Sequence, residues 1–390
     1  MNPVLVENSK QVRLAVLPPL ALYVHIPWCV RKCPYCDFNS HQVGGELPER
    51  EYVEKLMLDL ESLLPSVWGR RVLSVFIGGG TPSLFSPESI DALLSAIRAR
   101  LALEPHAEIT LEANPGTVEA ARFRGFRAAG VNRISVGVQS FDDAMLARLG
   151  RIHSSAEARR AIDAALESFD NVNLDLMYGL PGQSVEMARA DLEQALQCAV
   201  PHLSAYQLTI EPNTAFWSKP PLLPEHDLCA DVQLMIEETL HQGGFEHYET
   251  SAFAKPGMRC RHNLNYWEFG DYLGIGAGAH GKVSFPDRVT RHERVKQPRD
   301  YLQKSTLAED KTVPPSELPF EFMLNALRLV EGFEVKLFSE RTGLALSTIE
   351  AGLEKAEAKG LIERDWKLIR PTARGQRFLN ELLQLFLPEK

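Results

Sequence analysis

The sequence predicts an α/β protein whose parallel sheet forms a barrel or a partial barrel. From residue 20 to about residue 210, short runs rich in β-branched and aromatic residues alternate with longer helical stretches. This alternation is typical of βαβ units, whose right-handed connections keep the strands parallel. Six such units make a barrel or part of one, and functional residues then gather at the carboxyl ends of the strands.

Each element of this pattern has its own local signal. The predicted strands span residues 22–26, 72–77, 108–111, 133–138, 171–177 and 204–210. The helices expected between them span 49–64, 87–101, 117–129, 155–168 and 184–198. The second helix has Ser86 as its N-cap and Pro87 in its first turn, and Thr117 is a capping residue type at the start of the third.

Beyond residue 220 the pattern changes. The Pro-rich stretch 219–224 reads as a connector before a helix at 226–242, and a charged stretch near 287–311 is expected to be exposed. Helices at 334–342 and 347–359 followed by short strands predict a winged-helix-like domain. The expected organisation is a tail at 1–20, a barrel at 21–225, an intermediate segment at 226–312 and the winged-helix-like domain at 313–390.

Composition and charge exclude several classes of protein. The 390 residues carry 42 Lys and Arg against 51 Asp and Glu, so the formal charge is 42 − 51 = −9. An acidic chain is a poor general nucleic-acid binder, because phosphates require clustered cations. The chain has no apolar run of about 18 residues, and its first 20 residues have no apolar core of a secretory signal. We therefore expect a cytoplasmic protein without a transmembrane helix.

The winged-helix-like domain lacks the net positive charge expected of a DNA-binding domain. Residues 311–390 hold 12 Lys and Arg and 12 Asp and Glu, and the helix at 347–359 has a net charge of −1. A recognition helix in a major groove needs cations for phosphates and base edges. The last helix, from Phe378, is strongly apolar and is expected to pack on its own domain.

Three of the six cysteines form a motif. Cys29, Cys33 and Cys36 have C-x3-C-x2-C spacing directly after the first predicted strand, whereas Cys198, Cys229 and Cys260 are scattered. A zinc site would need a fourth ligand, for which His25 or His41 are candidates. A cubane iron–sulfur cluster normally takes four cysteines, so three would leave one iron open to an exogenous ligand.

Glycines and polar residues occupy the other strand ends. Gly78, Gly79 and Gly80 follow the second strand, where the missing Cβ atoms let a ligand approach the backbone. Charged groups in apolar strands are costly unless they are paired or liganded. A polar pocket is one explanation for these groups, and an Arg151–Asp175 ion pair is the alternative. The polar residues concerned are Glu112, Gln139, Arg151 and Asp175.

The cysteine motif together with Gly78-Gly79-Gly80-Thr81-Pro82 resembles the radical S-adenosylmethionine (SAM) superfamily. The segments YVHIPWC, GGGTPS, EANPGT, GVQSF and DLMYGLPGQ resemble its coproporphyrinogen-dehydrogenase-like branch, over roughly residues 20–390. The resemblance implies a partial (β/α)6 barrel with a 4Fe–4S cluster on the three cysteines and SAM on its open iron. It also implies SAM contacts from residues matching Tyr23, Tyr35, Gly79, Gly80, Glu112, Gln139, Arg151 and Asp175.

One departure within this branch separates two families. The dehydrogenases carry a fourth cysteine where this chain has Phe38, and their leader is longer than the 28 residues before Cys29. CDFNSH and HNLNYW instead resemble the heme chaperone family HemW, in which HNxxYW is implicated in heme binding. This resemblance implies heme contacts from His262, Tyr266 and Trp267, with His262 expected to be exposed and Cys260 as the next candidate ligand. The alternative is that HNLNYW is a packed loop with His262 hydrogen-bonded inside.

Three functions remain open from the sequence. The first, implied by the HemW resemblance, is heme binding and delivery to acceptor hemoproteins such as membrane respiratory enzymes. The second is a radical enzyme that cleaves SAM to a 5′-deoxyadenosyl radical for porphyrinogen decarboxylation, in which the cofactor performs the chemistry. The third is an iron–sulfur transcription sensor, which the charge of the C-terminal domain disfavours.

Overall fold

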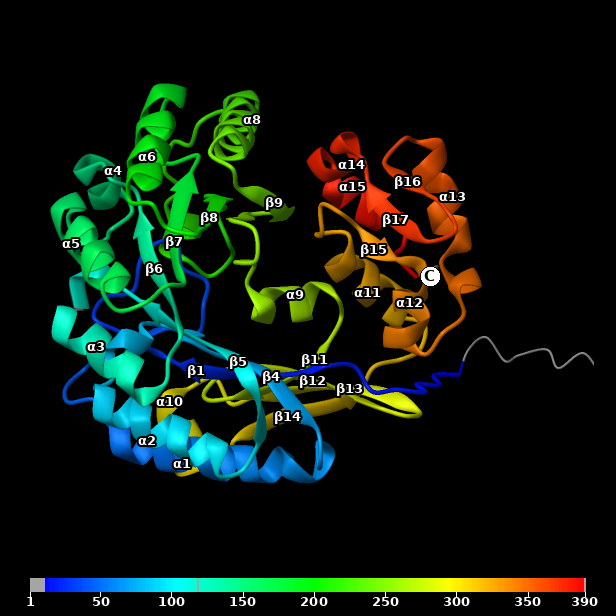
Figure 1. The fold of residues 1–390 in the computed structure, drawn as a ribbon, viewed down its shortest axis with the longest axis horizontal. Helices are drawn as coiled ribbons and strands as arrows, with labels where there is room; N and C mark the ends of the chain where they lie inside the picture. The colour runs from blue at the N-terminus through cyan, green and yellow to red at the C-terminus, as the bar shows by residue number, and fades with distance from the viewer. Residues whose placement is uncertain (1–10, 118, 389–390) are drawn as a thin grey trace, which may run out of the picture.

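The computed structural model describes residues 11–388 except residue 118 and contains the parallel sheet that the sequence predicts. Each of the six predicted strands overlaps an observed one: β1 (Leu20–Ile26), β4 (Arg71–Gly79), β5 (Ala102–Ala113), β6 (Arg133–Gln139), β7 (Val172–Tyr178) and β8 (His202–Gln207). Figure 1 shows helices outside this curved sheet: α1 (Glu49–Leu63), α2 (Pro87–Arg98), α3 (Ala120–Ala129), α4 (Asp143–Arg148), α5 (Ser155–Leu166) and α6 (Val185–Gln197).

The helix starts confirm one capping prediction and correct another. The Ser86 hydroxyl accepts a hydrogen bond from the Ser89 amide, as an N-cap does. Thr117, however, does not start α3, which begins at Ala120. Its hydroxyl donates instead to the Asn114 carbonyl, in a short 3-10 turn that separates β5 from the helix.

The sheet is wider than predicted. Its order is β14-β13-β12-β11-β1-β4-β5-β6-β7-β8-β10-β9, and β11 (Asp271–Ile275) is a seventh parallel strand beside β1. The flanking strands are antiparallel: β9 (Glu246–Glu249) and β10 (Ala252–Ala254) at one edge, and β12 (His280–Phe285), β13 (Arg288–Arg294) and β14 (Leu307–Thr312) at the other. The remaining helices of this part are α7 (Ala215–Ser218), α8 (His226–Gln242), α9 (Arg261–Trp267) and α10 (Pro298–Gln303).

The stretch 287–311, expected to be exposed, is only partly so. β14 is exposed throughout, but β13 lies between two strands and buries His292 and Arg294. The Arg294 guanidinium lies 2.8 Å from the carboxylate of Asp59 on α1, and both side chains are at most 1% exposed. The expectation failed because the partner that makes this burial tolerable is more than 200 residues away in the sequence.

The C-terminal residues have a second apolar core. Their order is α11 (Leu318–Ala326), β15 (Phe333–Glu334), α12 (Val335–Thr342), α13 (Glu350–Ala358), β16 (Ile362–Arg364), β17 (Leu368–Pro371), α14 (Ala373–Arg377) and α15 (Leu379–Gln384). This order is consistent with the winged-helix-like interpretation. Leu382, Leu383 and Phe386 are buried, as expected of the last helix. Val12 and Leu14 from the expected N-terminal tail also join this core, whereas residues 1–10 lie outside the described part.

The second core is placed beside the open side of the sheet. Figure 1 shows α9 between the strands and the C-terminal elements. In the part of the chain that the structure describes, no helix has the length and apolar character needed to span a bilayer.

Candidate functional site

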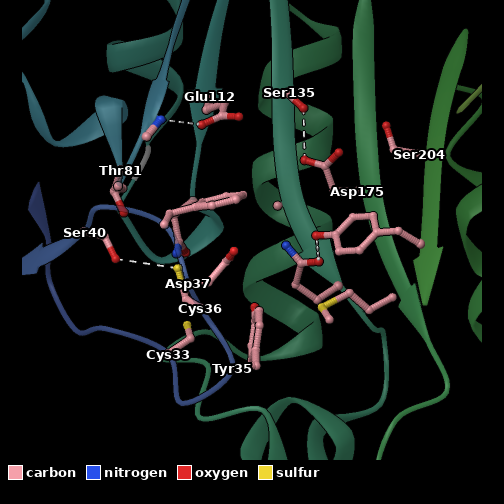
Figure 2. A pocket seen from close by; sticks show the side chains of 18 of the residues that line it. Cys33, Tyr35, Cys36, Asp37, Ser40, Thr81, Glu112, Ser135, Asp175 and Ser204 are labelled. Atoms are coloured by element: carbon pink, nitrogen blue, oxygen red, sulfur yellow. Dashed lines mark hydrogen bonds between the residues drawn. The ribbon is translucent and has the colours of Figure 1, made fainter. Parts of the chain in front are cut away.

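The three motif cysteines line a cavity of about 630 Å³ at the carboxyl end of β1. Cys29 ends the short strand β2 (Trp28–Cys29), which pairs with β3 (His41–Gln42), so that the loop between them carries Cys33 and Cys36. All three thiols are free and partly exposed. Figure 2 shows this loop at one end of the cavity, with Ser135, Asp175 and Ser204 toward the other end.

Asn39 fastens the cysteine loop to the rest of the molecule. Its side-chain amide donates to the carbonyls of Ala277 and Lys296, both at 2.8 Å. The backbone carbonyl oxygen of Asn39 lies 3.0 Å from Nε2 of His25. Nδ1 of His25 lies 2.9 Å from the Tyr23 hydroxyl. Both ring nitrogens of His25 are therefore occupied, which excludes it as the fourth ligand of a zinc site in this conformation.

The glycine strip brings backbone close to the cysteines. A Cβ on Gly80 would lie 2.6 Å from the Trp28 carbonyl oxygen, and one on Gly79 would lie 2.7 Å from the His25 ring. Gly79 also has a φ of +118°, a conformation that other residues rarely adopt. The site therefore needs glycine here for packing as well as for ligand access.

Two carboxyl groups inside the barrel form no ion pair among the residues that the structure describes, although the nearby Arg133 guanidinium opposes the rise in the pKa of both. Oε2 of Glu112 accepts a hydrogen bond from the Gly79 amide at 3.0 Å. Burial, reinforced by the nearby Asp175, raises the pKa of Glu112 to about 8. Burial also raises the pKa of Asp175, despite hydrogen bonds from Asn173 and Ser135. A ligand with a positive charge or several donors would compensate this cost.

Arg151 and Gln139 lie nearer the cysteines. The Arg151 guanidinium donates to the Gly137 carbonyl at 2.7 Å and lies 3.7 Å from the Cys33 sulfur. Among the described residues it forms no ion pair with Asp175, so the alternative explanation of these two charges is wrong. Gln139 has a φ of +71°, and its side-chain oxygen accepts a hydrogen bond from the Tyr206 hydroxyl at 2.7 Å. This contact holds a strained backbone position at the cavity wall.

Seven of the eight predicted SAM contacts line the same cavity: Tyr35, Gly79, Gly80, Glu112, Gln139, Arg151 and Asp175. Tyr23 does not line it but reaches the site through His25. Further residues line the cavity that the sequence motifs did not identify, among them Ser135, Ser204, Tyr206, Glu249, Ser251, Asn263 and Arg328. Alternation along β6 could have found Ser135, which faces the same side as Gln139. Arg328 carries no local signal, because the C-terminal elements supply it.

HNLNYW belongs to the helix α9 and is not a loop, but His262 is hydrogen-bonded inside, as the alternative interpretation expected. His262 is 1% exposed, and its Nδ1 lies 2.9 Å from the Ser74 hydroxyl on β4. Burial, with Arg133 nearby, lowers its pKa to about 3, so the imidazole is neutral. The expectation of an exposed His262 is therefore wrong, because the amphipathic helix turns this side chain into the barrel. Of this motif, only Asn263 lines the cavity.

The residues at the cysteine end fit a cluster with one open iron. Three thiols share one wall, and the other three cysteines lie apart at the end of α6, on α8 and before α9. The glycine strip and Glu112 lie beside the thiols, where a chelating ligand of the open iron would need close backbone and an acceptor. When bound, the cluster supplies an electron and an iron site for the amino and carboxylate groups of SAM.

Comparison with known proteins first defines the class. Residues 23–195 match the radical SAM superfamily, and residues 313–378 match the HemN C-terminal domain. The structure is similar to that of the Escherichia coli coproporphyrinogen III oxidase HemN, described as a radical SAM enzyme, with a TM-score of 0.80 and 23% identity over 95% of this chain and 90% of that chain. At that identity the likeness shows the fold alone.

Sequence relatives define the family. The heme chaperone HemW of Escherichia coli is 52% identical over 96% of this chain and 99% of its own length. HemW of Haemophilus influenzae is 50% identical with the same coverage, and a mouse mitochondrial radical S-adenosyl methionine domain-containing protein is 37% identical over 95% of this chain. The chain belongs to the HemW family of the radical SAM superfamily.

Replacing Cys29, Cys33 or Cys36 with Ala should each abolish the 4Fe–4S cluster, because only two thiolates would remain. The measurement is visible absorbance together with iron and sulfide content after anaerobic reconstitution. Cys198→Ala and Cys229→Ala are the matched controls and should retain the cluster. A complete cluster in Cys33→Ala would overturn the ligand assignment.

Glu112→Gln should weaken SAM binding by the cluster-loaded protein roughly tenfold or more, the loss expected for a hydrogen bond to a charged group. It should also stabilise the cofactor-free protein. The folded-state pKa of Glu112, about 8, exceeds its ordinary value, so its ionisation favours unfolding increasingly from about pH 4.5 to 8.

The difference in unfolding free energy between Glu112→Gln and the parent should therefore grow over that pH range to at least about 1.4 kcal/mol, the value of one pKa unit. Urea unfolding at several pH values measures it. Glu54→Gln, at a surface carboxylate that is 63% exposed, is the matched control for a change of Glu to Gln. A constant difference for Glu112→Gln would show that its carboxyl ionises freely in the folded protein.

Proposed function

We propose that this protein binds heme and delivers it to acceptor hemoproteins, with a 4Fe–4S cluster on Cys29, Cys33 and Cys36 and SAM in the adjoining cavity. The observation that carries the proposal is the match to proteins named heme chaperone HemW at 52% and 50% identity, over 99% of their lengths. Membrane respiratory enzymes are the acceptors we propose, and the cytoplasm is the compartment.

Phe38 supports the chaperone over the decarboxylating enzyme. It lines the cavity two residues after Cys36 and is 59% exposed. By the resemblance described above, the dehydrogenases carry a cysteine at this position. A phenyl ring provides neither a thiol for catalysis nor a proton, so we do not expect coproporphyrinogen III to be decarboxylated here.

The HNLNYW helix remains our proposed heme-contact region, but in a form changed by the structure. His262 can reach a heme iron only if α9 leaves Ser74. Tyr266 packs edge-on against both His262 and Tyr272, and Trp267 lies under the guanidinium of Arg328. In the conformation observed, the motif therefore contacts the cavity through Asn263 and supports its wall through Trp267.

Heme titration and a decarboxylation assay on one anaerobically reconstituted sample test the function. Heme should bind at micromolar concentration, an affinity of about 8 kcal/mol. Coproporphyrinogen III should remain unconverted even with SAM and a reduced cluster. An authentic coproporphyrinogen dehydrogenase in the same assay is the positive control. Conversion of the substrate by this protein, or absence of heme binding, would contradict the proposal.

His262→Ala should lower stability and leave heme affinity essentially unchanged. The variant loses the contact with Ser74 and buried packing between Phe76 and Tyr266, which together are worth about 1–3 kcal/mol. Thermal unfolding and heme titration measure the two effects. Loss of heme binding with an unchanged Tm would instead show that His262 ligates heme iron after α9 opens.

A further inference from the structure

Arg328 is held at the cavity by backbone contacts between the two parts of the protein. Its carbonyl accepts a hydrogen bond from the Thr250 amide at 3.1 Å, and the Val330 amide donates to the Tyr248 carbonyl at 3.2 Å. Leu329 forms an isolated bridge with Glu249 at the end of β9. The segment after α11 thus extends the edge of the barrel sheet and brings its arginine to the cavity wall.

The Arg328 guanidinium is fixed in place but uses little of its hydrogen-bonding capacity. Its Cζ lies 4.2 Å from the ring centroid of Trp267, a distance typical of a cation–π contact. Its side chain makes one hydrogen bond among the described residues, from Nη2 to Glu249 at 3.3 Å, and its Nε is buried without a partner. A guanidinium has five N–H donors in a planar fork, so its two terminal amino groups retain donors beyond the one that Nη2 gives to Glu249.

Arg328 also differs in position from the other cations of the cavity. Among the residues that the structure describes, the lining contains Arg31, Arg151 and Arg328 and no lysine. Arg31 belongs to the cysteine loop, and Arg151 already contacts Gly137 and Cys33. The wall also contains Glu249, whose carboxylate pairs with Arg328 at 3.3 Å, and two neutral donors, the hydroxyl of Ser251 and the amide of Asn263. An anion with oxygen acceptors suits this end of the cavity.

We propose that Arg328, with Asn263 and Ser251, forms a subsite that binds a carboxylate, and that its ligand is a propionate of heme. The inference rests on the proposed function, since heme supplies the carboxylate. Arginine pairs with carboxylates through two parallel hydrogen bonds, which adds direction as well as strength. The subsite also explains how the HNLNYW helix serves heme binding while His262 is buried. This helix supplies Asn263 to the subsite, and its Trp267 packs against the guanidinium of Arg328.

The experiment compares heme with its dimethyl ester, in which both propionates are uncharged. Each is titrated into the reconstituted full-length protein, its Arg328→Gln variant and the control Arg364→Gln, in one detergent-containing buffer. Arg364 lies in the same C-terminal part and pairs with Glu350 and Glu357. The parent and the control should bind heme at least tenfold more tightly than the ester, the loss expected for one charge-assisted hydrogen bond. In Arg328→Gln the two ligands should bind equally.

The outcomes distinguish failure of the proposed subsite from failure of the proposed function. Equal binding of heme and ester by the parent protein would overturn the subsite while the heme-binding function stands. A preference for heme that persists in Arg328→Gln would overturn the assignment to Arg328. Absence of binding for both ligands to the parent would refute the proposed function itself. If Arg328→Gln does not fold, Arg328→Lys, which retains the charge but not the planar fork, should keep only part of the preference.

Discussion

The cysteine loop at the functional end of the molecule is anchored by the hydrogen bonds of one residue, Asn39, through both its side chain and its backbone carbonyl. The backbone of the cysteine loop is otherwise held by a two-residue strand and by single contacts such as the Phe216 amide, which donates to the Pro34 carbonyl at 2.9 Å. Asn39 connects the loop to Ala277 and Lys296, which flank β12 and β13, and to His25 on β1. The segment that follows the barrel therefore positions the residues at its beginning, and β11 beside β1 makes this connection part of one sheet.

The barrel interior is built for ligands at the expense of its own stability. Glu112 and Asp175 are partly buried at the cavity wall, and burial raises the pKa of both carboxyl groups. Gln139 adopts a backbone conformation that is unfavourable for residues other than glycine. The apolar core between the sheet and the outer helices compensates these costs, because it contains the inward faces of α1, α2, α3, α5 and α6.

The C-terminal part belongs to the site as well as to the fold. Its apolar core is separate from that of the barrel, yet Phe269 after α9 and Val289 of β13 are part of it. Arg328, which also belongs to the C-terminal part, lines the cavity. Residues 313–378 match the HemN C-terminal domain, and the structure of HemN shares the fold of this chain over 95% of its length.

The sequence alone determined the features that depend on neighbours along the chain. Strand and helix periodicity predicted the six parallel strands, and local spacing identified Cys29, Cys33 and Cys36. The resemblance of short motifs to the radical SAM superfamily located seven further residues that line the cavity. Tertiary structure decided what depends on distant partners. It placed β11 beside β1, made the burial of Arg294 tolerable through Asp59, and brought Arg328 to the cavity. It also buried His262 against Ser74. The sequence of this motif is the same whether its helix faces solvent or packs against a strand, so the sequence alone could not predict the burial. Periodicity reports which residues share a face, but the partner of that face is set by contacts between segments hundreds of residues apart.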